Sequence, residues 1–245
     1  MRYSYSSIST FGQCPFKWKL RYKDKLKTIP DTAPDNAIYI GLGLHKGIEE
    51  GSADVGVAEY FSHYNIITDD NINWSMQLQH QIPKVLELLP KGGEHELKLE
   101  TERFVGFVDY VVDNTLFDFK MSNNVASYSK SPQLSIYKYY LEQARPDMHI
   151  DSLNYVMVPK IQIIQRTKSG ESLQQFRERL QKELENSEIQ IVNVPYSTDS
   201  VTDFLECCKF LDSCEEFPKN PTRLCDWCEY KPYCQKGEDW MILTD

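Results

Sequence analysis

The chain has 245 residues with 41% hydrophobic and 26% charged side chains, and no apolar run approaches the roughly 18 residues of a membrane span. This composition is typical of a globular protein with a sizeable core, and the length fits one α/β domain with appendages. The formal net charge of −9 excludes a uniformly basic surface, so nucleic-acid binding would require a local basic groove.

Residues 1–92 form a predicted helical part, because apolar residues recur there at helical spacing. The start of the chain combines Ser and Thr cap candidates with Ile8 and Trp18, which predicts a helix. A loop with two prolines follows at 30–34, and the last helix of this part ends before Gly92. The predicted helices cover 6–22, 36–50, 55–64 and 75–89.

Residues 93–168 form the predicted core, where the pattern changes from helical to strand-like. Three successive strands are followed by one helix, and a further hairpin is predicted around Pro159-Lys160. This order of elements predicts an α/β fold with a mixed central sheet flanked by helices. The predicted strands cover 94–104, 106–112, 115–121, 152–158 and 161–167, and the predicted helix covers 132–144.

Residues 169–213 form a second predicted helical part, and residues 214–245 form a cysteine-rich tail. The helical spacing of apolar residues predicts helices over 171–186 and 199–211. The chain contains no internal repeat and no low-complexity segment. We therefore expect the helical parts and the tail to be appendages of a single domain that spans residues 1–245.

Two carboxylates and one lysine form the sharpest catalytic signal in the sequence. Asp109 ends a Gly-x-x-Asp run that begins at Gly106, and the run Asp118-Phe119-Lys120 follows nine residues after Asp109. Alternate residues of a strand share a face, so Asp118 and Lys120 would project together. If the two strands pair as a hairpin, Asp109 lies beside Asp118 across the pair.

Such a group of side chains has the chemistry of metal-assisted phosphodiester hydrolysis. Hard divalent cations such as Mg²⁺ and Mn²⁺ prefer oxygen ligands, which Asp109 and Asp118 supply. Lys120 can orient the attacking water or stabilise the charge that builds on the phosphate. The alternative is an ordinary strand with an Asp–Lys ion pair at its edge, which the Gly-x-x-Asp run on the preceding strand disfavours.

These motifs resemble the core of the PD-(D/E)XK nuclease superfamily, in which a Gly-x-x-Asp strand precedes a strand carrying (Asp/Glu)-x-Lys. Further matches are specific to its RecB-like branch. His45 is similar to a helix-borne metal histidine of that branch, and Gln133 and Tyr137 match its Gln-x-x-x-Tyr motif. By this resemblance, Gln133 and Tyr137 complete the catalytic set and contact the substrate or hold Lys120.

The same resemblance implies a restriction-endonuclease-like fold and a set of metal ligands. His45, Asp109 and Asp118 would hold Mg²⁺ or Mn²⁺. The family often carries a glutamate on the first core strand, and Glu96 is the favoured candidate in this chain, although we do not include it among the predicted ligands.

The cysteines form a separate pattern. Residues 1–5 lack the apolar core of a signal peptide, so we expect an intracellular protein, cytoplasmic unless viral in origin. In such a protein, we expect the seven cysteines to bind a metal or cluster rather than to form disulfides. Cys225, Cys228 and Cys234 follow Cys-x2-Cys-x5-Cys spacing, which binds zinc or an iron–sulfur cluster. Either the local Cys214 or the distant Cys14 could be the fourth ligand.

The resemblance to RecB-like iron–sulfur nucleases favours Cys14, which precedes Pro15 in a stretch similar to the N-terminal helix of that branch. It implies a [4Fe-4S] cluster that joins the two ends of the chain around the nuclease core. Zinc is the alternative occupant. The implied cluster ligands are Cys14, Cys225, Cys228 and Cys234.

We therefore expect a metal-dependent deoxyribonuclease of recombination, repair or replication, more often an exonuclease on DNA ends or single strands than an endonuclease. The alternatives are a CRISPR-adaptation-type end-trimming nuclease, a non-catalytic iron–sulfur DNA-binding or scaffold protein, and a zinc-bearing interaction module. The sequence contains no Gly-x4-Gly-Lys-[Ser/Thr] phosphate loop, so any ATP-driven unwinding would come from a helicase or recombination partner. We expect no membrane partner.

Overall fold

The computed structural model describes residues 1–237 and 242–243, so residues 238–241 and 244–245 of the predicted tail lie outside the described residues. A five-stranded sheet with strand order β2-β3-β4-β5-β6 forms the centre of the fold. β4 and β5 are parallel and the other neighbours are antiparallel, which confirms the predicted mixed sheet. The strands are β2 (Glu94–Glu100), β3 (Val105–Val112), β4 (Thr115–Met121), β5 (Ser152–Val158) and β6 (Gln190–Val194).

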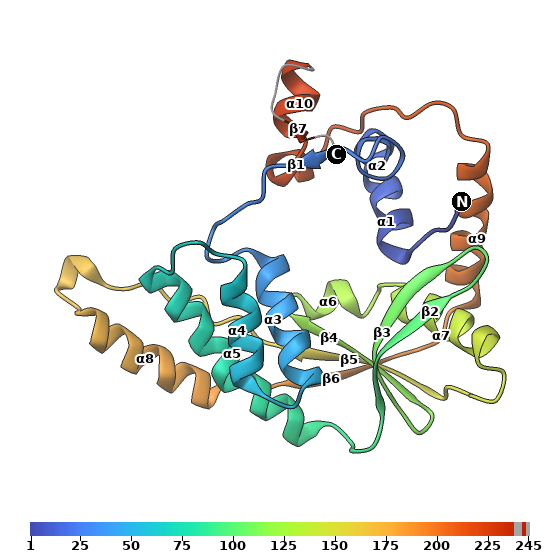
Figure 1. Cartoon of the computed structure of the whole chain (residues 1–245). Coiled ribbons are helices and arrows are strands. Elements are labelled where there is room, and N and C mark those ends of the chain that lie inside the picture. Colours follow the sequence, from blue (N-terminus) through green and yellow to red (C-terminus); the bar gives the residue numbers. More distant parts are fainter. Residues whose placement is uncertain (238–241, 244–245) are drawn as a thin grey trace.

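Helices cover both faces of this sheet, as predicted for the α/β class (Figure 1). On one face, Leu44 of α3 packs with Phe119 of β4 in a buried cluster. On the other face, Leu134 of α7 packs with Leu116 of β4. The first face carries α3 (Ala37–Glu49), α4 (Ala53–Ser62) and α5 (Asp69–Leu88), and the second carries α1 (Tyr5–Gln13), α7 (Gln133–Ala144) and α9 (Thr198–Asp212).

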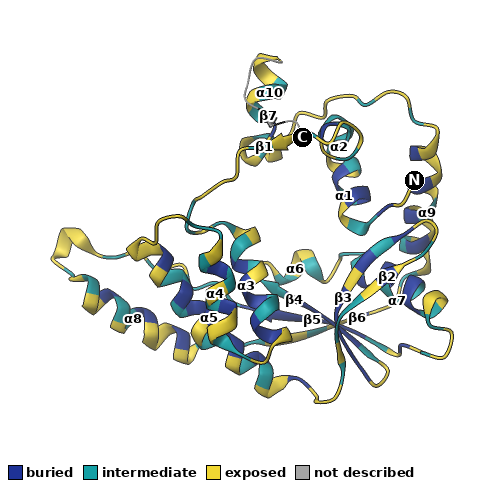
Figure 2. Ribbon diagram, in the orientation of Figure 1, coloured by how far each residue is buried: buried dark blue, intermediate teal, exposed yellow. Residues whose placement is uncertain are grey.

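Burial follows this layering (Figure 2). The sheet and the inner sides of its helices are buried, whereas α8 (Leu173–Asn186) contacts α5 and buries three residues on one side. Among the described residues, no helix combines the length and the apolar character needed to cross a membrane.

The prediction of one continuous helix over residues 6–22 is wrong, because the helix is interrupted at Cys14. α1 ends at Gln13, and α2 (Pro15–Trp18) continues into a π-helical turn (Lys19–Lys23). Cys14 is extended, with φ −159° and ψ 107°. The ring of Pro15 disfavours a helical conformation in the residue before it. Cys14 therefore stands at the corner between two short helices.

The predicted strand at 161–167 is also wrong, and β6 takes its place in the sheet. The backbone of Ile161 is held by α5, because its amide donates to Gln77 Oε1 at 2.9 Å and its carbonyl accepts from Gln77 Nε2 at 3.1 Å. A backbone satisfied by side chains needs no strand partner. β6, which the sequence did not indicate, pairs antiparallel with β5.

The segment 13–28 near the start of the chain lies beside the C-terminal segment (Figure 1). β1 (Lys27–Thr28) pairs with β7 (Ile242–Leu243). The amide of Phe16 donates to the Pro218 carbonyl at 3.1 Å, and Asn220 Nδ2 donates to the Gln13 carbonyl at 2.8 Å. The other short elements are α6 (Val125–Tyr128), η3 (Arg223–Trp227) and α10 (Lys231–Lys236).

Candidate active site

The site lies where β3 and β4 diverge. Their register ends at the pair Tyr110 and Phe117. Beyond this pair, a side chain takes the place of the backbone hydrogen bonds between the strands: the amide of Phe119 donates to Asp109 Oδ2 at 2.7 Å. The alternation of side chains also breaks, since Val108 and Tyr110 pack into clusters on opposite faces of the sheet. The divergence therefore sets Asp109 into a gap between two strands.

His45 reaches this gap from α3. Its Nε2 lies 3.1 Å from the carbonyl oxygen of Phe119 and must donate, because a carbonyl can only accept. Its Nδ1 faces Asp109 Oδ1 at 3.5 Å and Glu96 Oε1 at 3.6 Å. A ring nitrogen that donates to a backbone carbonyl fixes the orientation and tautomer of a metal-binding histidine. Nδ1 is therefore the nitrogen that is available to a metal.

Glu96 belongs to this site, although it is absent from the predicted ligand set. The register of β2 and β3 places it opposite Asp109, between the paired residues His95 and Leu97. Its φ of +47° is in the left-handed region, which is rare for non-glycine residues and concentrates at functional sites. His45, Glu96 and Asp109 offer ligand atoms that all lie within 4.8 Å of one another and could hold a metal ion. The only signal in the sequence was a glutamate on the first core strand.

Asp118 and Lys120 form a second group beside Asp109, on the side of α7. Asp118 is fully buried, and its Oδ1 accepts from Gln133 Nε2 at 2.8 Å. Its Oδ2 forms an ion pair with Lys120. Tyr137 stands one helical turn after Gln133, and all five side chains line one cavity of about 360 Å³. Gln133 thus holds one oxygen of the Asp118 carboxylate and Lys120 holds the other.

Burial and charge act against each other at these groups. Burial and the neighbouring Asp109 raise the pKa of Asp118 to about 6, although Lys120 opposes them. Burial also favours the neutral form of Asp109, but His45 and Lys120 hold its pKa below the usual value. Burial lowers the pKa of His45, and the facing carboxylates, above all Asp109, overcome this and raise it to about 10. Burial likewise lowers the pKa of Lys120, but the charges of Asp118 and Asp109 outweigh this effect. The net pKa lies above the usual lysine value, so Lys120 is a cation.

The structure therefore brings every predicted catalytic and metal-binding residue to one place. Their individual roles stay predictions, and Asp118 lies outside the group of three that shares one potential ion position. The residues brought together are His45, Asp109, Asp118, Lys120, Gln133 and Tyr137.

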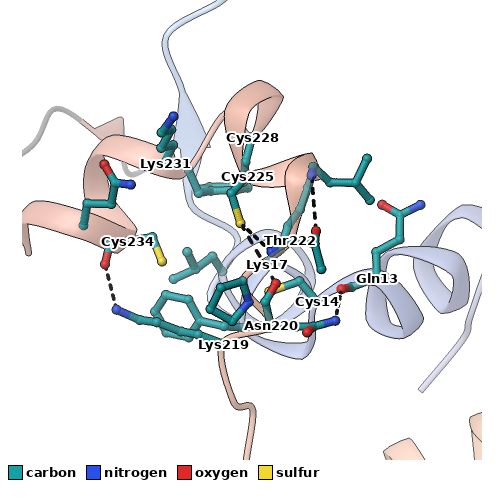
Figure 3. Close-up of a pocket in the computed structure, with 16 residues that line it drawn as sticks. Gln13, Cys14, Lys17, Lys219, Asn220, Thr222, Cys225, Cys228, Lys231 and Cys234 are labelled. Carbon is teal, nitrogen blue, oxygen red and sulfur yellow. Dashed lines mark hydrogen bonds between the residues drawn. The ribbon is translucent and has the colours of Figure 1, made fainter.

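The four cysteines predicted to bind a cluster line one cavity of about 510 Å³. In Figure 3, the sulfur atoms of Cys14, Cys225 and Cys234 point toward this cavity from the two ends of the chain. Cys228 also lines it, whereas Cys214 does not. Of the two candidate fourth ligands, the structure thus places Cys14 beside the triad.

The cysteine sulfurs are not preassembled around one ion position. Thiolates that share a tetrahedral zinc ion lie about 3.8 Å apart, because each Zn–S bond is about 2.3 Å. Within the part of the chain that the structure describes, the one group of three or more potential ligand atoms within 4.8 Å of one another is the group of His45, Glu96 and Asp109. The four cysteines therefore share a cavity without forming such a group.

A family model matches residues 2–235, which include the carboxylate site and all four cavity cysteines. The chain belongs to the PD-(D/E)XK nuclease superfamily. The crystal structure of a candidate exonuclease from Eubacterium rectale is similar to this nuclease, with a TM-score of 0.54 at 11% sequence identity over 92% of each chain. At this identity the similarity shows the fold alone. None of the curated proteins matches the sequence.

Proposed function

We propose that this nuclease hydrolyses DNA phosphodiester bonds with a divalent cation and acts as an exonuclease. The observation that carries the proposal is the gap between β3 and β4. There, the group of His45, Glu96 and Asp109 lies next to the buried pair of Asp118 and Lys120. An edge-strand ion pair with only a structural role would need neither the histidine from α3 nor the distorted backbone at Glu96.

Each residue has a separate task in this proposal. A divalent cation would supply Lewis-acid stabilisation and lower the pKa of a bound water. His45, Glu96 and Asp109 would hold the cation, and the imidazole shifts the preference toward Mn²⁺ over Mg²⁺, because imidazole is a softer ligand than oxygen. Lys120 keeps its proton and therefore stabilises the negative charge on the phosphate rather than acting as a base.

Gln133 and Tyr137 act on the second group. Gln133 fixes Asp118 by donating to one carboxylate oxygen, which leaves the other oxygen beside Lys120. Burial and the charge of Asp118 raise the pKa of Tyr137 to about 12, so the phenol stays neutral and can donate a hydrogen bond to a phosphate oxygen. The assignment to an exonuclease is supported by the name of the similar structure, a candidate exonuclease, and by the resemblance to RecB-like nucleases.

We also propose that Cys14, Cys225, Cys228 and Cys234 hold an iron–sulfur cluster. The donor set of four thiols around one cavity fits such a group. The cluster would supply a covalent link between the helical corner at Cys14 and the C-terminal segment. Its role is to fix α1, because the N-cap residue Ser4 and the helix residue Ser6 line the active-site cavity.

The test compares linear and covalently closed circular single-stranded DNA as substrates. Anaerobically purified protein and its Asp118→Asn variant are incubated with Mn²⁺, Mg²⁺ or EDTA, and the linear strand is labelled at either end. We expect digestion of the linear strand from one end in Mn²⁺, intact circles, and no cleavage by the variant or in EDTA.

Two other outcomes would contradict the proposal in different ways. Cleavage of the circles would assign the protein as an endonuclease. No cleavage by folded wild-type protein with either metal would overturn the nuclease proposal and favour a non-catalytic DNA-binding protein.

A further inference from the structure

Phe107 is the one exposed residue of β3. The residues on either side of it, Gly106 and Val108, are buried, and so are Asp109 and the rest of the strand toward Val112. The Phe107 side chain is 48% exposed. By contrast, Phe104 is fully buried and stacks on Tyr140 with ring centroids 4.0 Å apart. Phe107 therefore presents an aromatic surface to solvent from a strand whose other side chains serve the core or the active site.

The position of Phe107 relates directly to the reacting group. It lines the active-site cavity with Asp109, Asp118 and Lys120. It precedes Asp109 by two residues, and two residues of a strand span about 6.6–6.8 Å. This separation is close to the length of one nucleotide in an extended single strand. A base next to the phosphate at Asp109 can thus reach the ring of Phe107.

The basic side chains near Phe107 are paired with carboxylates: Lys120 with Asp118, and Arg2 and Lys98 with Glu100. Lys98 is the partner of Phe107 in the register, and its ion pair with Glu100 is 2.5 Å long. Glu96 lies on the same strand, two residues before Lys98. Stacking of a base on the ring of Phe107 would add binding energy that does not depend on these charges.

We propose that Phe107 is the stacking platform for the base of the nucleotide adjacent to the scissile bond, and that it directs the site to unpaired DNA. This inference rests on the proposed nuclease function and names its substrate class. A base inside a duplex has both faces covered by its neighbours, so a single-stranded nucleotide offers Phe107 a face that an internal paired nucleotide does not. Every base has such a face, so the platform selects unpaired nucleotides without selecting a sequence.

The test compares wild-type protein with Phe107→Leu and Phe107→Tyr on a single-stranded oligonucleotide that carries one abasic nucleotide at its centre. Single-turnover cleavage by wild-type protein should slow about 5- to 150-fold at the abasic position, which corresponds to about 1–3 kcal/mol per stacked base. Phe107→Tyr should keep this discrimination. Phe107→Leu should cleave intact and abasic positions at similar, reduced rates. The control is Phe210→Leu, since Phe210 is 59% exposed on α9 and lines none of the active-site cavity.

A binding assay separates a failure of stacking from a failure of the nuclease proposal. In an Asp118→Asn background, fluorescence anisotropy measures the affinity for labelled oligo-dT and for an all-abasic strand of equal length. Phe107→Leu should weaken oligo-dT binding about 5- to 150-fold and leave the abasic strand unaffected. Equal affinities of Phe107→Leu and its parent for oligo-dT would overturn the inference, even if cleavage is observed. If the protein binds oligo-dT more tightly than the abasic strand but wild-type protein cleaves neither, the stacking role of Phe107 would stand and the nuclease proposal would be refuted.

Discussion

Gly43 and Gly41 lie on the same helix, two and four residues before His45, and an alanine should have opposite effects at the two positions. A Cβ at Gly43 would meet the backbone oxygen of Gly56 at 2.7 Å and Leu78 Cδ1 at 2.9 Å. A Cβ at Gly41 would meet nothing within 4 Å. In both variants, alanine favours the helix by about 0.8–1 kcal/mol relative to glycine. The intrinsic gain is common to both, so the difference between the variants measures the packing of α3 against α4.

Overpacking of a buried contact costs about 1–3 kcal/mol. Gly41→Ala should therefore raise the free energy of unfolding by up to about 1 kcal/mol. The free energy of unfolding of Gly43→Ala should be about 1–3 kcal/mol lower than that of Gly41→Ala, because the backbone of α4 cannot rotate away as a side chain can. Urea denaturation of the metal-free proteins measures both values.

The same substitution also tests how His45 is held. Displacement of α3 from α4 moves His45 relative to Asp109 and Glu96, so Gly43→Ala should bind Mn²⁺ more weakly than Gly41→Ala. Two variants of equal stability and equal Mn²⁺ affinity would refute the reasoning.

Three further predictions concern the two sites. Because metal-free His45 has a pKa of about 10, Mn²⁺ must displace its proton. The apparent Mn²⁺ association constant should therefore rise about tenfold per unit between pH 7 and 9 and level off above about 10, and an affinity that calorimetry finds independent of pH would contradict this. Lys120→Met should lower kcat about 10²- to 10³-fold with little change in Mn²⁺ affinity, whereas wild-type kcat would exclude its electrostatic role. Cys14→Ser should lose iron and visible absorbance on anaerobic purification, while Cys214→Ser, outside the cavity, should retain both.

The sequence was sufficient for the parts of the fold in which local pattern and pairing agree. The alternation around Asp118 predicted that Asp118 and Lys120 project together, and in the structure the two side chains form an ion pair. The hairpin on which the expected closeness of Asp109 and Asp118 depends is present as the antiparallel pair of β3 and β4. The mixed sheet then followed from the order of strands and helices.

The parts that sequence could not give depend on contacts between distant segments. Residues 161–166 have strand-like composition, but Gln77 satisfies the backbone of Ile161 from α5, and no local signal predicts that contact. Edge strand β6 was missed because most of its five residues are exposed and only Val194 is buried. The break at Cys14 did have a local signal in the following proline, which the helical spacing of the aromatic residues outweighed.

Glu96 shows the same limit at the active site. Its place among the potential ligands depends on a positive φ and on the divergence of β3 from β4, and neither feature is encoded in the alternating pattern of Glu96-Leu97-Lys98-Leu99. The sequence has four glutamates in or next to the first core strand, Glu94, Glu96, Glu100 and Glu102. Only the register of β2 against β3 identifies the one that faces Asp109.

The central claim is that Asp109 and its two neighbours hold the catalytic metal, and Asp109→Asn tests it most directly. The substituted side chain keeps an oxygen that can accept from the Phe119 amide, so the fold should be retained. Cleavage of end-labelled single-stranded DNA is measured as a function of Mn²⁺ concentration for both proteins, with urea denaturation as the control for folding. We predict at least about a 100-fold loss of cleavage with weaker Mn²⁺ binding, because the metal contributes several kcal/mol to transition-state stabilisation. Cleavage by Asp109→Asn at the wild-type rate and Mn²⁺ concentration would contradict the claim.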